Sequence, residues 1–429
     1  MRIVSARITG FRNLADVDLD LAPGVNIVLG PNGQGKTNLL EALHFPALGR
    51  SHRGARHDDL VAFGSDALHV AVTVEEAPGR GHRFEYGIDR AGGRRYRVDG
   101  EVVALQSELV GRLAAVYFDP ETVRLVREGP EQRRRFLDRG LSLIDPAYLA
   151  SLTAYHRALR QKASILRDLK RRLVSTAEVG DEVRAWNTEL AHHAAAVIRG
   201  RARYLADLDP AARAAHGRLT DPRAELSTEY RPQMEAARAA AAAARRTEES
   251  LERAADGGPG SVSGAPRPAS SEGEVGDPPQ ISPERPLEGP EKDDLEQEIF
   301  REFDYIWPDE VRRGRPLSGP QRDDLEVRLD GQDLRRYGSQ GETRTAAVAL
   351  VLGQSEVVHR RRQVRPVLFL DDIFSELDRE RARRLQDLAV ADHQLLVATA
   401  RAEDVAGWRP AHRKVWTVAA GVLTVGDDV

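Results

Sequence analysis

The chain has 429 residues, which is enough for two or more domains with a sizeable core. It contains no cysteine, so disulfides, thiolate metal sites and cysteine nucleophiles are excluded, and the composition fits a reducing compartment. No apolar run reaches the roughly 18 residues needed to span a bilayer, and the N-terminal residues lack the apolar core of a signal peptide. We therefore expect a cytoplasmic protein without a membrane partner.

The formal net charge of −4 hides an uneven distribution of charge. Residues 256–298 hold eleven acidic and three basic side chains, a net charge of −8, so the rest of the chain carries +4. Residues 122–172 hold thirteen basic and five acidic side chains, a net charge of +8. A basic zone of this kind is typical of a polyanion contact, and the alternative is an ion-paired, solvated helix face.

The first hundred residues are predicted to be rich in β-strands. Residues 17–21 and 69–75 alternate apolar and polar side chains with period two. Residues 84–88 and 96–98 flank a pair of glycines and are predicted to pair as a hairpin.

The most informative motif lies inside this region, after the apolar run of residues 25–29. Residues 30–37 read G-x-x-x-x-G-K-T, the loop that cradles phosphates in nucleotide hydrolases, and residues 37–43 follow with helical spacing. Its backbone N–H groups and the helix N-terminus would face one anion, whereas the alternative is an ordinary glycine turn. Only five of the 63 basic residues are lysines, so a lysine in this loop indicates that a compact point charge is needed. The candidate nucleotide-binding residues are Gly30, Pro31, Asn32, Gly33, Gln34, Gly35, Lys36, Thr37 and Asn38.

The character of the chain changes after this β-rich part. Residues 130–250 are poor in glycine and rich in alanine, arginine and leucine, and we predict a helical region in which the alanine run 239–244 extends the last helix. Residues 255–290 have almost no large apolar side chains, so we predict a disordered acidic insertion. Strands and helices alternate again from about residue 300 to the end.

Two carboxylates follow the apolar strand predicted over residues 367–370. At the tip of a parallel strand beside the phosphate loop, Asp371 would hold Mg²⁺ together with the Thr37 hydroxyl. Asp372 would orient or deprotonate the attacking water, and Lys36 would complete the catalytic set. The alternative is a strand that merely ends in aspartate before a turn.

Residues 338–342 contain a Ser-x-Gly turn directly before a predicted helix. Its hydroxyl, backbone N–H groups and helix dipole form a second anion-binding device, and the alternative is a plain N-cap. One ATP needs only one such device from each subunit. The presence of both the phosphate loop and the Ser-x-Gly turn therefore suggests that Ser339 and Gly341 contact a nucleotide bound by a partner molecule.

These features together resemble the RecF family of ABC-type ATPases. The resemblance rests on residues 11–13 (FRN), 30–42 (GPNGQGKTNLLEA), 118–120 (FDP), 129–138 (GPEQRRRFLD), 148–149 (YL), 319–325 (GPQRDDL), 339–345 (SQGETRT) and 370–378 (LDDIFSELD). It implies an α/β fold: an ABC-type head with a phosphate loop and a mixed sheet with an antiparallel β subdomain, built from residues 1–125 and 311–429. A helical arm would comprise residues 126–254 and 291–310.

The resemblance also implies a mechanism. Two copies would dimerise around two ATP molecules, with Ser339 and Gly341 contacting the nucleotide in trans, Asp378 lining the interface and Arg12 approaching the phosphates. The family binds DNA, hydrolyses ATP slowly, and acts with RecO and RecR to load RecA on gapped DNA. For this chain we expect a DNA partner that is single-stranded, double-stranded or gapped. We expect the side chains of Arg133, Arg134 and Arg135 to contact the phosphate backbone of DNA. The alternative is that these arginines hold the arm to the head.

The chain departs from the family pattern at several positions. Gln321 stands where the family usually has histidine, and Ala400 stands where ABC transporters carry a switch histidine. Asp372 replaces the glutamate of fast ABC hydrolases, which fits slow turnover. We expect a weak ATPase that DNA stimulates. Gln106 is a candidate for the metal-contacting glutamine of ABC proteins.

Other ATP-binding classes explain fewer of these motifs. Small-molecule kinases need no signature turn, a GTPase would carry an Asn-Lys-x-Asp motif, and an overcoming-lysogenisation-type nuclease would add a nuclease domain. SMC proteins share the head but have far longer arms. An SMC-like or scaffold protein that binds DNA and ATP with little hydrolysis is the alternative that we keep.

Overall fold

The computed structural model of the chain describes residues 1–77, 79–103, 108–171, 175–220, 223–235, 238, 292–390, 393–406, 408 and 410–426. The acidic insertion at 255–290, the alanine run at 239–244 and Gln106 lie outside these residues, so the expectations for them stay predictions. Within the described part of the chain, no helix combines the length and the apolar character that crossing a bilayer requires.

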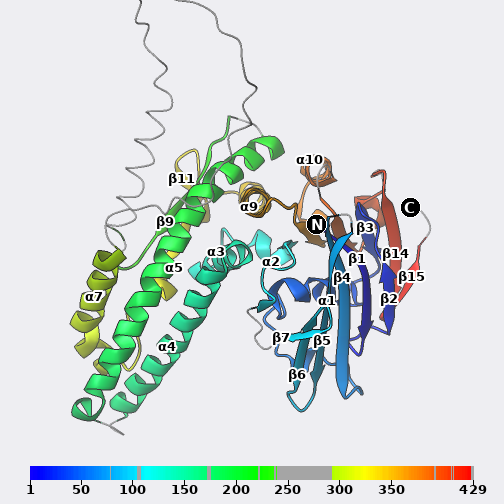
Figure 1. Cartoon of the computed structure of the whole chain (residues 1–429). Coiled ribbons are helices and arrows are strands. Elements are labelled where there is room, and N and C mark those ends of the chain that lie inside the picture. The colour runs from blue at the N-terminus through cyan, green and yellow to red at the C-terminus, as the bar shows by residue number, and fades with distance from the viewer. Residues whose placement is uncertain are drawn as a thin grey trace, which may run out of the picture.

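The central sheet joins the two ends of the chain (Figure 1). Its strands, in spatial order, are β15 (Val422–Val425), β14 (Arg413–Ala419), β3 (Val25–Leu29), β13 (Leu395–Thr399), β12 (Val367–Asp371) and β8 (Ala115–Phe118). All neighbours are parallel except β15, which is antiparallel to β14. Every residue of β3, β12 and β13 is buried, as expected for parallel strands covered on both faces.

The two faces of this sheet belong to different cores. Ile27, Leu368 and Val397 pack into a core shared with the helices, whereas Val28 and Phe369 pack with α1 (Lys36–Leu48) and a second sheet. Because side chains alternate along a strand, each central strand serves both cores.

The second sheet is antiparallel and contains the strands expected in the first hundred residues. Its order is β2 (Val17–Asp20), β1 (Arg2–Thr9), β4 (Ala67–Ala77), β5 (Arg80–Asp89), β6 (Arg94–Val98) and β7 (Glu101–Val103). The predicted hairpin is confirmed, because Phe84 of β5 pairs with Val98 of β6.

The helices besides α1 are α2 (Pro120–Val123), α3 (Pro130–Ile144), α4 (Pro146–Lys170), α5 (Thr176–Leu219), α7 (Lys292–Arg313), α8 (Leu334–Tyr337), α9 (Gln340–Arg362) and α10 (Arg379–Val390). Of these, α3, α4, α5 and α7 lie together to one side of the sheets, and we call these four helices the arm and the rest the head (Figure 1). Short 3-10 helices are η1 (Asp58–Leu60), η3 (Pro320–Arg322), η4 (Ile373–Glu376) and η5 (Ala402–Asp404).

One strand interrupts the region that we expected to be helical. β9 (Leu226–Arg231) pairs with β10 (Asp324–Leu329), which also pairs with β11 (Gln332–Asp333). Leu226 and Tyr230 of β9 are buried. The partner strand lies about a hundred residues away, so local composition does not reveal this strand.

The arm and the head share a tightly packed helix crossing. At Gly353 of α9, a Cβ atom would lie only 2.8 Å from the backbone nitrogen of Ala212 in α5. Any larger residue would push the two helices apart, so glycine is required for this approach. The long helix α5 is thereby held against the helix that begins at the Ser-x-Gly turn.

A buried ion pair connects two helices of the arm. Nζ of Lys162 in α4 lies 2.7 Å from Oε2 of Glu310 in α7, and their side chains are 1% and 0% exposed. Glu310 Oε1 also accepts a hydrogen bond from the backbone N–H of Leu317 at 2.8 Å. The pair fixes α7 against α4.

We predict that Glu310→Ala lowers the free energy of unfolding by about 3–5 kcal/mol, because it leaves the Lys162 ammonium buried without a counter-charge. The double variant Lys162→Met/Glu310→Leu removes both charges and should lie within about 1 kcal/mol of the wild type. Urea unfolding followed by circular dichroism measures both. Equal stabilities of Glu310→Ala and the double variant would show that the unpaired Lys162 charge does not cause the loss of stability.

Candidate functional site

The phosphate loop begins at the buried end of β3, between β13 and β14. At Gly30 a Cβ atom would lie 2.3 Å from the carbonyl oxygen of Val418, so only glycine fits there. Gly33 and Gly35 have φ angles of +80° and +117°, which side chains disfavour. Gly35 is the N-cap of α1 and provides no side-chain cap, so the first N–H groups of the helix can bind an anion.

Lys36 folds back over this loop. Its Nζ donates to the carbonyl oxygens of Gly30 at 2.8 Å and Pro31 at 3.2 Å, and to Oδ1 of Asn32 at 3.2 Å. Lys36 is 4% exposed. The ammonium group therefore sits inside the loop, as a point charge that could exchange loop oxygens for phosphate oxygens.

Distant segments hold the loop in shape. The backbone N–H groups of Ala420 and Gly421 donate to the Gln34 side chain at 2.5 Å and to its carbonyl at 3.0 Å. Asn13 Nδ2 donates to the carbonyl of Gly33 at 3.2 Å, and Asn38 Nδ2 donates to Asn13 Oδ1 at 2.7 Å.

Arg12 lies beside the loop but binds a protein carboxylate. Its Nε and Nη2 donate to the two oxygens of Glu41, at 2.6 and 3.1 Å. Glu41, on α1, is fully buried and also accepts a hydrogen bond from the Ser51 hydroxyl at 2.5 Å. Sequence reasoning missed Glu41, although an acidic residue in an apolar helix is the signal that could have found it. Within the described chain, Arg12 acts as a structural partner of α1.

Thr37 and Asp371 come together although they are far apart in the chain. The Thr37 hydroxyl donates to Asp371 Oδ1 at 3.1 Å, and the Tyr117 hydroxyl donates to Asp371 Oδ2 at 3.1 Å. Burial raises the pKa of the Asp371 carboxyl to about 6, against the effect of these two hydrogen bonds. Hydroxyl and carboxylate oxygens are ligands that Mg²⁺ prefers, so this pair fits the ion. No sequence signal pointed to Tyr117.

Asp372 adopts an unusual backbone conformation next to this pair. Its φ angle is +53°, and its half-buried carboxylate accepts a hydrogen bond from the backbone N–H of Ala400 at 3.3 Å. ABC transporters carry a switch histidine at the position of Ala400, and here the group that residue 400 offers to Asp372 is its backbone N–H.

The Ser-x-Gly turn is a solvent-facing helix start. The backbone N–H of Glu342 donates to the Ser339 hydroxyl at 3.3 Å, and the N–H of Ser339 donates to the Glu342 carboxylate at 2.8 Å. Nη1 of Arg381 lies 3.2 Å from the place of a Cβ atom on Gly341, and Arg381 is paired with the exposed Asp378 at 2.9 Å. In the described residues, no hydrogen bond or ion pair joins this turn to the phosphate loop of the same chain.

The three consecutive arginines of α3 have different environments. Arg133 is 2% exposed and makes a two-pronged ion pair with Asp324 at 2.7 and 2.9 Å. Its Nη1 also donates to the carbonyl of Glu128 at 2.5 Å. This geometry corrects the expectation of a DNA contact for Arg133, because its donors are buried and used. Arg135 is exposed, and among the described residues its ion pair is with Glu131 of the same helix.

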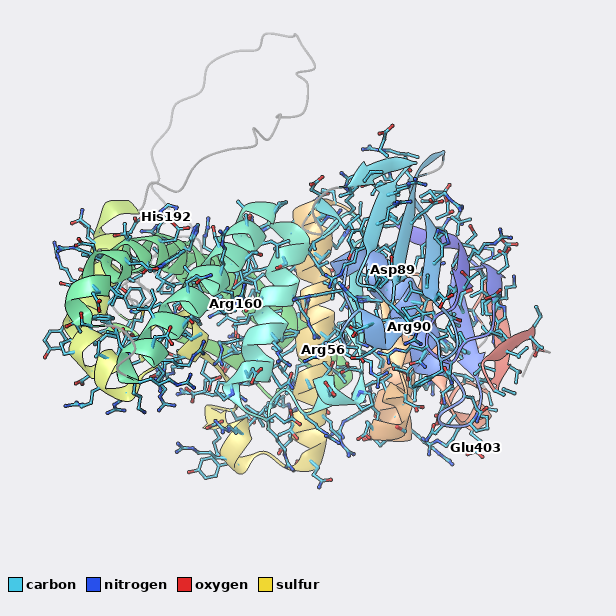
Figure 2. The ribbon with its side chains drawn as sticks, turned by 90° about the horizontal axis from the view of Figure 1, so that it is seen from below. Arg56, Asp89, Arg90, Arg160, His192 and Glu403 are labelled. Carbon is cyan, nitrogen blue, oxygen red and sulfur yellow. The ribbon has the colours of Figure 1, made fainter. Side chains whose placement is uncertain are left out.

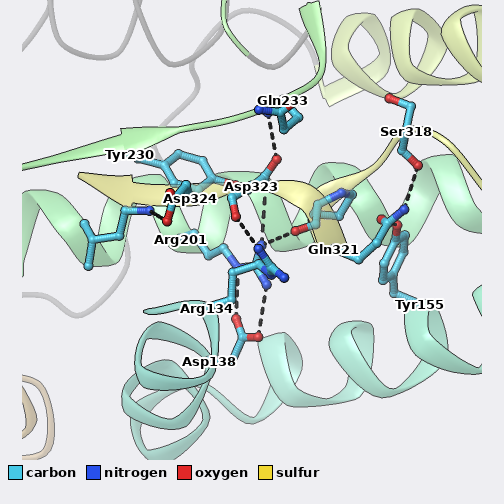
Figure 3. A network of polar contacts seen from close by, with 12 residues as sticks. Arg134, Asp138, Tyr155, Arg201, Tyr230, Gln233, Ser318, Gln321, Asp323 and Asp324 are labelled. Carbon is cyan, nitrogen blue, oxygen red and sulfur yellow. Dashed lines mark hydrogen bonds and ion pairs between the residues drawn. The ribbon is translucent and has the colours of Figure 1, made fainter. Parts of the chain in front are cut away.

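Arg134 belongs to a polar network at the base of the arm (Figure 3). It donates to the carbonyl of Asp323 at 2.6 Å. Arg201 of α5, fully enclosed, binds both oxygens of Asp138 at 2.9 and 3.0 Å. Tyr230 donates its hydroxyl to the carboxylate of Asp323, which also accepts from the N–H of Gln233 at 2.9 Å. The network joins α3, α5, β9 and η3.

Gln321 lies at the edge of the same network (Figure 3). Its side-chain oxygen accepts a hydrogen bond from the Tyr155 hydroxyl, and its Nε2 donates to the carbonyl of Ser318 at 2.9 Å. At this position the amide therefore connects η3 to α4.

Two comparisons decide the family. The model of the RecF/RecN/SMC N terminal domain matches residues 2–419. The DNA replication and repair protein RecF of Lactobacillus delbrueckii subsp. bulgaricus is 32% identical over 396 residues, covering 91% of this chain and 88% of that protein. The chain belongs to the RecF family.

Other RecF proteins match over the whole length. RecF of Lachnoclostridium phytofermentans is 28% identical over 428 residues, covering 99% of this chain and all of that protein. A solved structure of RecF with ATP, described as a recombination mediator in the RecFOR pathway, has a TM-score of 0.77 at 25% identity and 97% coverage of that chain. An Smc head bound to part of ScpA has a TM-score of 0.52 at 14% identity and 97% coverage of that chain, which supports the fold alone. The predicted ABC-type head fold is confirmed.

The raised pKa of Asp371 leads to a stability prediction. The carboxyl ionises at about pH 6 in the folded chain and at about 3.8 unfolded, so the folded state binds more protons between these values. Wild-type stability should therefore fall by about 3 kcal/mol in total relative to Asp371→Asn as the pH rises from about 3 to 7, and the difference should level off above about pH 7. Urea unfolding across this pH range tests it, and a constant difference between the two proteins would contradict it.

Proposed function

We propose that this RecF-family chain is an ATP-dependent DNA-binding protein of recombinational repair and replication. The observation that carries the proposal is the Thr37–Asp371 hydrogen bond of 3.1 Å, which brings the phosphate loop and the carboxylate of a distant strand to one point. That pairing has the residue types and the position of the nucleotide site of P-loop ATPases. The RecF relative with bound ATP supports ATP as the nucleotide.

In this proposal, each residue of the site has one role. Residues 30–38 cradle the triphosphate through backbone N–H groups, and Lys36 neutralises the β- and γ-phosphates. Thr37 and Asp371 would hold Mg²⁺, which when bound would neutralise charge on the phosphates. Asp372 orients the attacking water and accepts its proton. Its side chain is one bond shorter than glutamate, which favours slow turnover.

The nucleotide would act between two copies of the chain. Ser339 is exposed and Gly341 lies at the start of α9, so both are open to a partner, and Asp378 lies next to them. A partner's γ-phosphate would meet the helix N-terminus at this turn. ATP then binds the two heads together, and its hydrolysis separates them.

The arm and the partners complete the proposal. We assign residues 1–125 and 311–429 to the head, and 126–254 with 291–310 to the arm. The RecFOR pathway named for the relative supports RecO and RecR as partners. We propose the loading of RecA on gapped DNA as the outcome. The second candidate is a scaffold that binds ATP and DNA with little hydrolysis, favoured by the short Asp372 side chain.

We expect Lys36→Ala to abolish ATP-dependent dimerisation, because the β- and γ-phosphates lose their cation. Sedimentation velocity with and without ATP measures the dimer, and Lys292→Ala is the matched control that should still dimerise. Equal sedimentation of Lys36→Ala and the wild type in ATP would refute the nucleotide role of Lys36.

We expect Asp372→Asn to bind ATP and dimerise but to lose at least 90% of turnover, because an amide cannot accept the proton of water. Phosphate release under conditions of full dimerisation measures this loss. A variant with unchanged turnover would show that another group is the base. A wild type with no turnover would favour the scaffold.

A further inference from the structure

The loop after α1 lies between the nucleotide site and the arm. On the arm side, Nη2 of Arg139 in α3 donates to the carbonyl of His52 at 2.6 Å. On the nucleotide side, Nη1 of Arg53 donates to Oδ1 of Asn38 at 3.4 Å, directly after Thr37. Ser51 binds the buried Glu41. The loop is therefore fixed at both sides, and Arg50, which precedes Ser51, keeps part of its surface exposed.

Arginines from three segments gather where this loop meets the arm. Burial lowers the pKa of Arg50, and the charge of Arg135 lowers it further. The pKa of His156 in α4 is lowered by burial, and the charges of Arg160 and Arg50 add to this effect, which shows that both lie near it. In Figure 2, Arg160 lies on the arm and Arg56 on the edge of the head that adjoins it.

The acidic groups nearby do not balance this charge. Asp138 is closest, but both of its oxygens are bound by Arg201. Glu131 pairs with Arg135 on the exposed surface, where such a pair contributes little. Asp119 caps α2, and Glu121 is in its first turn. In the described part of the chain, Arg50 and Arg160 have no ion pair or side-chain hydrogen bond.

Like charges held together this way are stabilised by a polyanion. We propose that Arg50, Arg135 and Arg160, at the junction of the head and the arm, bind the phosphate backbone of DNA. The inference about this junction surface rests on the proposed function. It places DNA binding at exposed arginines and not at the buried Arg133. The contacts that we propose are to phosphates, which position DNA on a protein without reading its sequence.

The position of the surface links DNA to the nucleotide. A phosphate on Arg50 pulls on a loop whose next residues contact Glu41 and Asn38 of α1. Helix α1 starts at Lys36, so a shift of this loop reaches the phosphate cradle through two side-chain contacts. The surface thus provides a direct route by which DNA stimulates ATP hydrolysis.

The test is a charge reversal with a matched control. Arg50→Glu/Arg160→Glu removes the two unpaired cations, one on the head and one on the arm. Arg7→Glu/Arg312→Glu makes the same charge change on the head and the arm, at side chains that are 64% and 73% exposed. Fluorescence anisotropy with a labelled 30-base-pair duplex, from about 50 to 200 mM salt, measures binding.

We expect the junction variant to bind DNA at least tenfold more weakly than the wild type, and the control variant to stay within twofold. The slope of log affinity against log salt should fall by about 2 for the junction variant only, because two phosphate contacts are lost. Matching melting temperatures of the two variants confirm that both fold.

Three results would overturn the inference. Equal DNA affinity of the junction variant and the control would show that DNA binds elsewhere. Binding of a polyglutamate peptide to the wild type, with no binding of DNA, would identify an acidic protein as the partner. If the wild type dimerises with ATP but binds no DNA at low salt, the DNA part of the proposed function fails together with the inference.

Discussion

The position of β3 in the central sheet is the constraint on which the rest of the structure depends. This strand comes from the first thirty residues, yet both of its neighbours, β13 and β14, come from the last thirty-five. The phosphate loop leaves the end of β3, so its shape is set by strands at the far end of the sequence. Single contacts show this dependence. The carbonyl of Val418 leaves no room for a side chain at Gly30, and the N–H of Ala420 donates to the Gln34 side chain.

Buried charge organises the molecule around that sheet. Beside the phosphate loop, Glu41 accepts hydrogen bonds from Arg12 and Ser51. At the base of the arm, Asp138 accepts from Arg201, and Asp323 accepts from Tyr230. Such groups are costly to bury unless their hydrogen bonds are met, so they define the arrangement of elements more than they add stability. The site and the arm are thereby connected to the head through directional contacts.

Much of the site could be predicted from the sequence because it is local. The glycine loop, the apolar strand before it and the strand ending in Asp371 each carry a short pattern with a physical reason. The partners of these elements could not be predicted. Tyr117 reaches Asp371 only because β8 lies next to β12, and β9 is a strand only because β10 completes it. Arg133 looks like a surface charge in the sequence, but its burial depends on Asp324, nearly two hundred residues away.

The ion pair between Lys162 and Glu310 bears on the connection that leads into α7. It fixes the register of α7 on α4 from within the arm, independently of the chain that leads from residue 238 to residue 292. Loop-closure entropy rises only slowly with chain length, so a change in the length of that connection costs little while this contact holds α7 on α4.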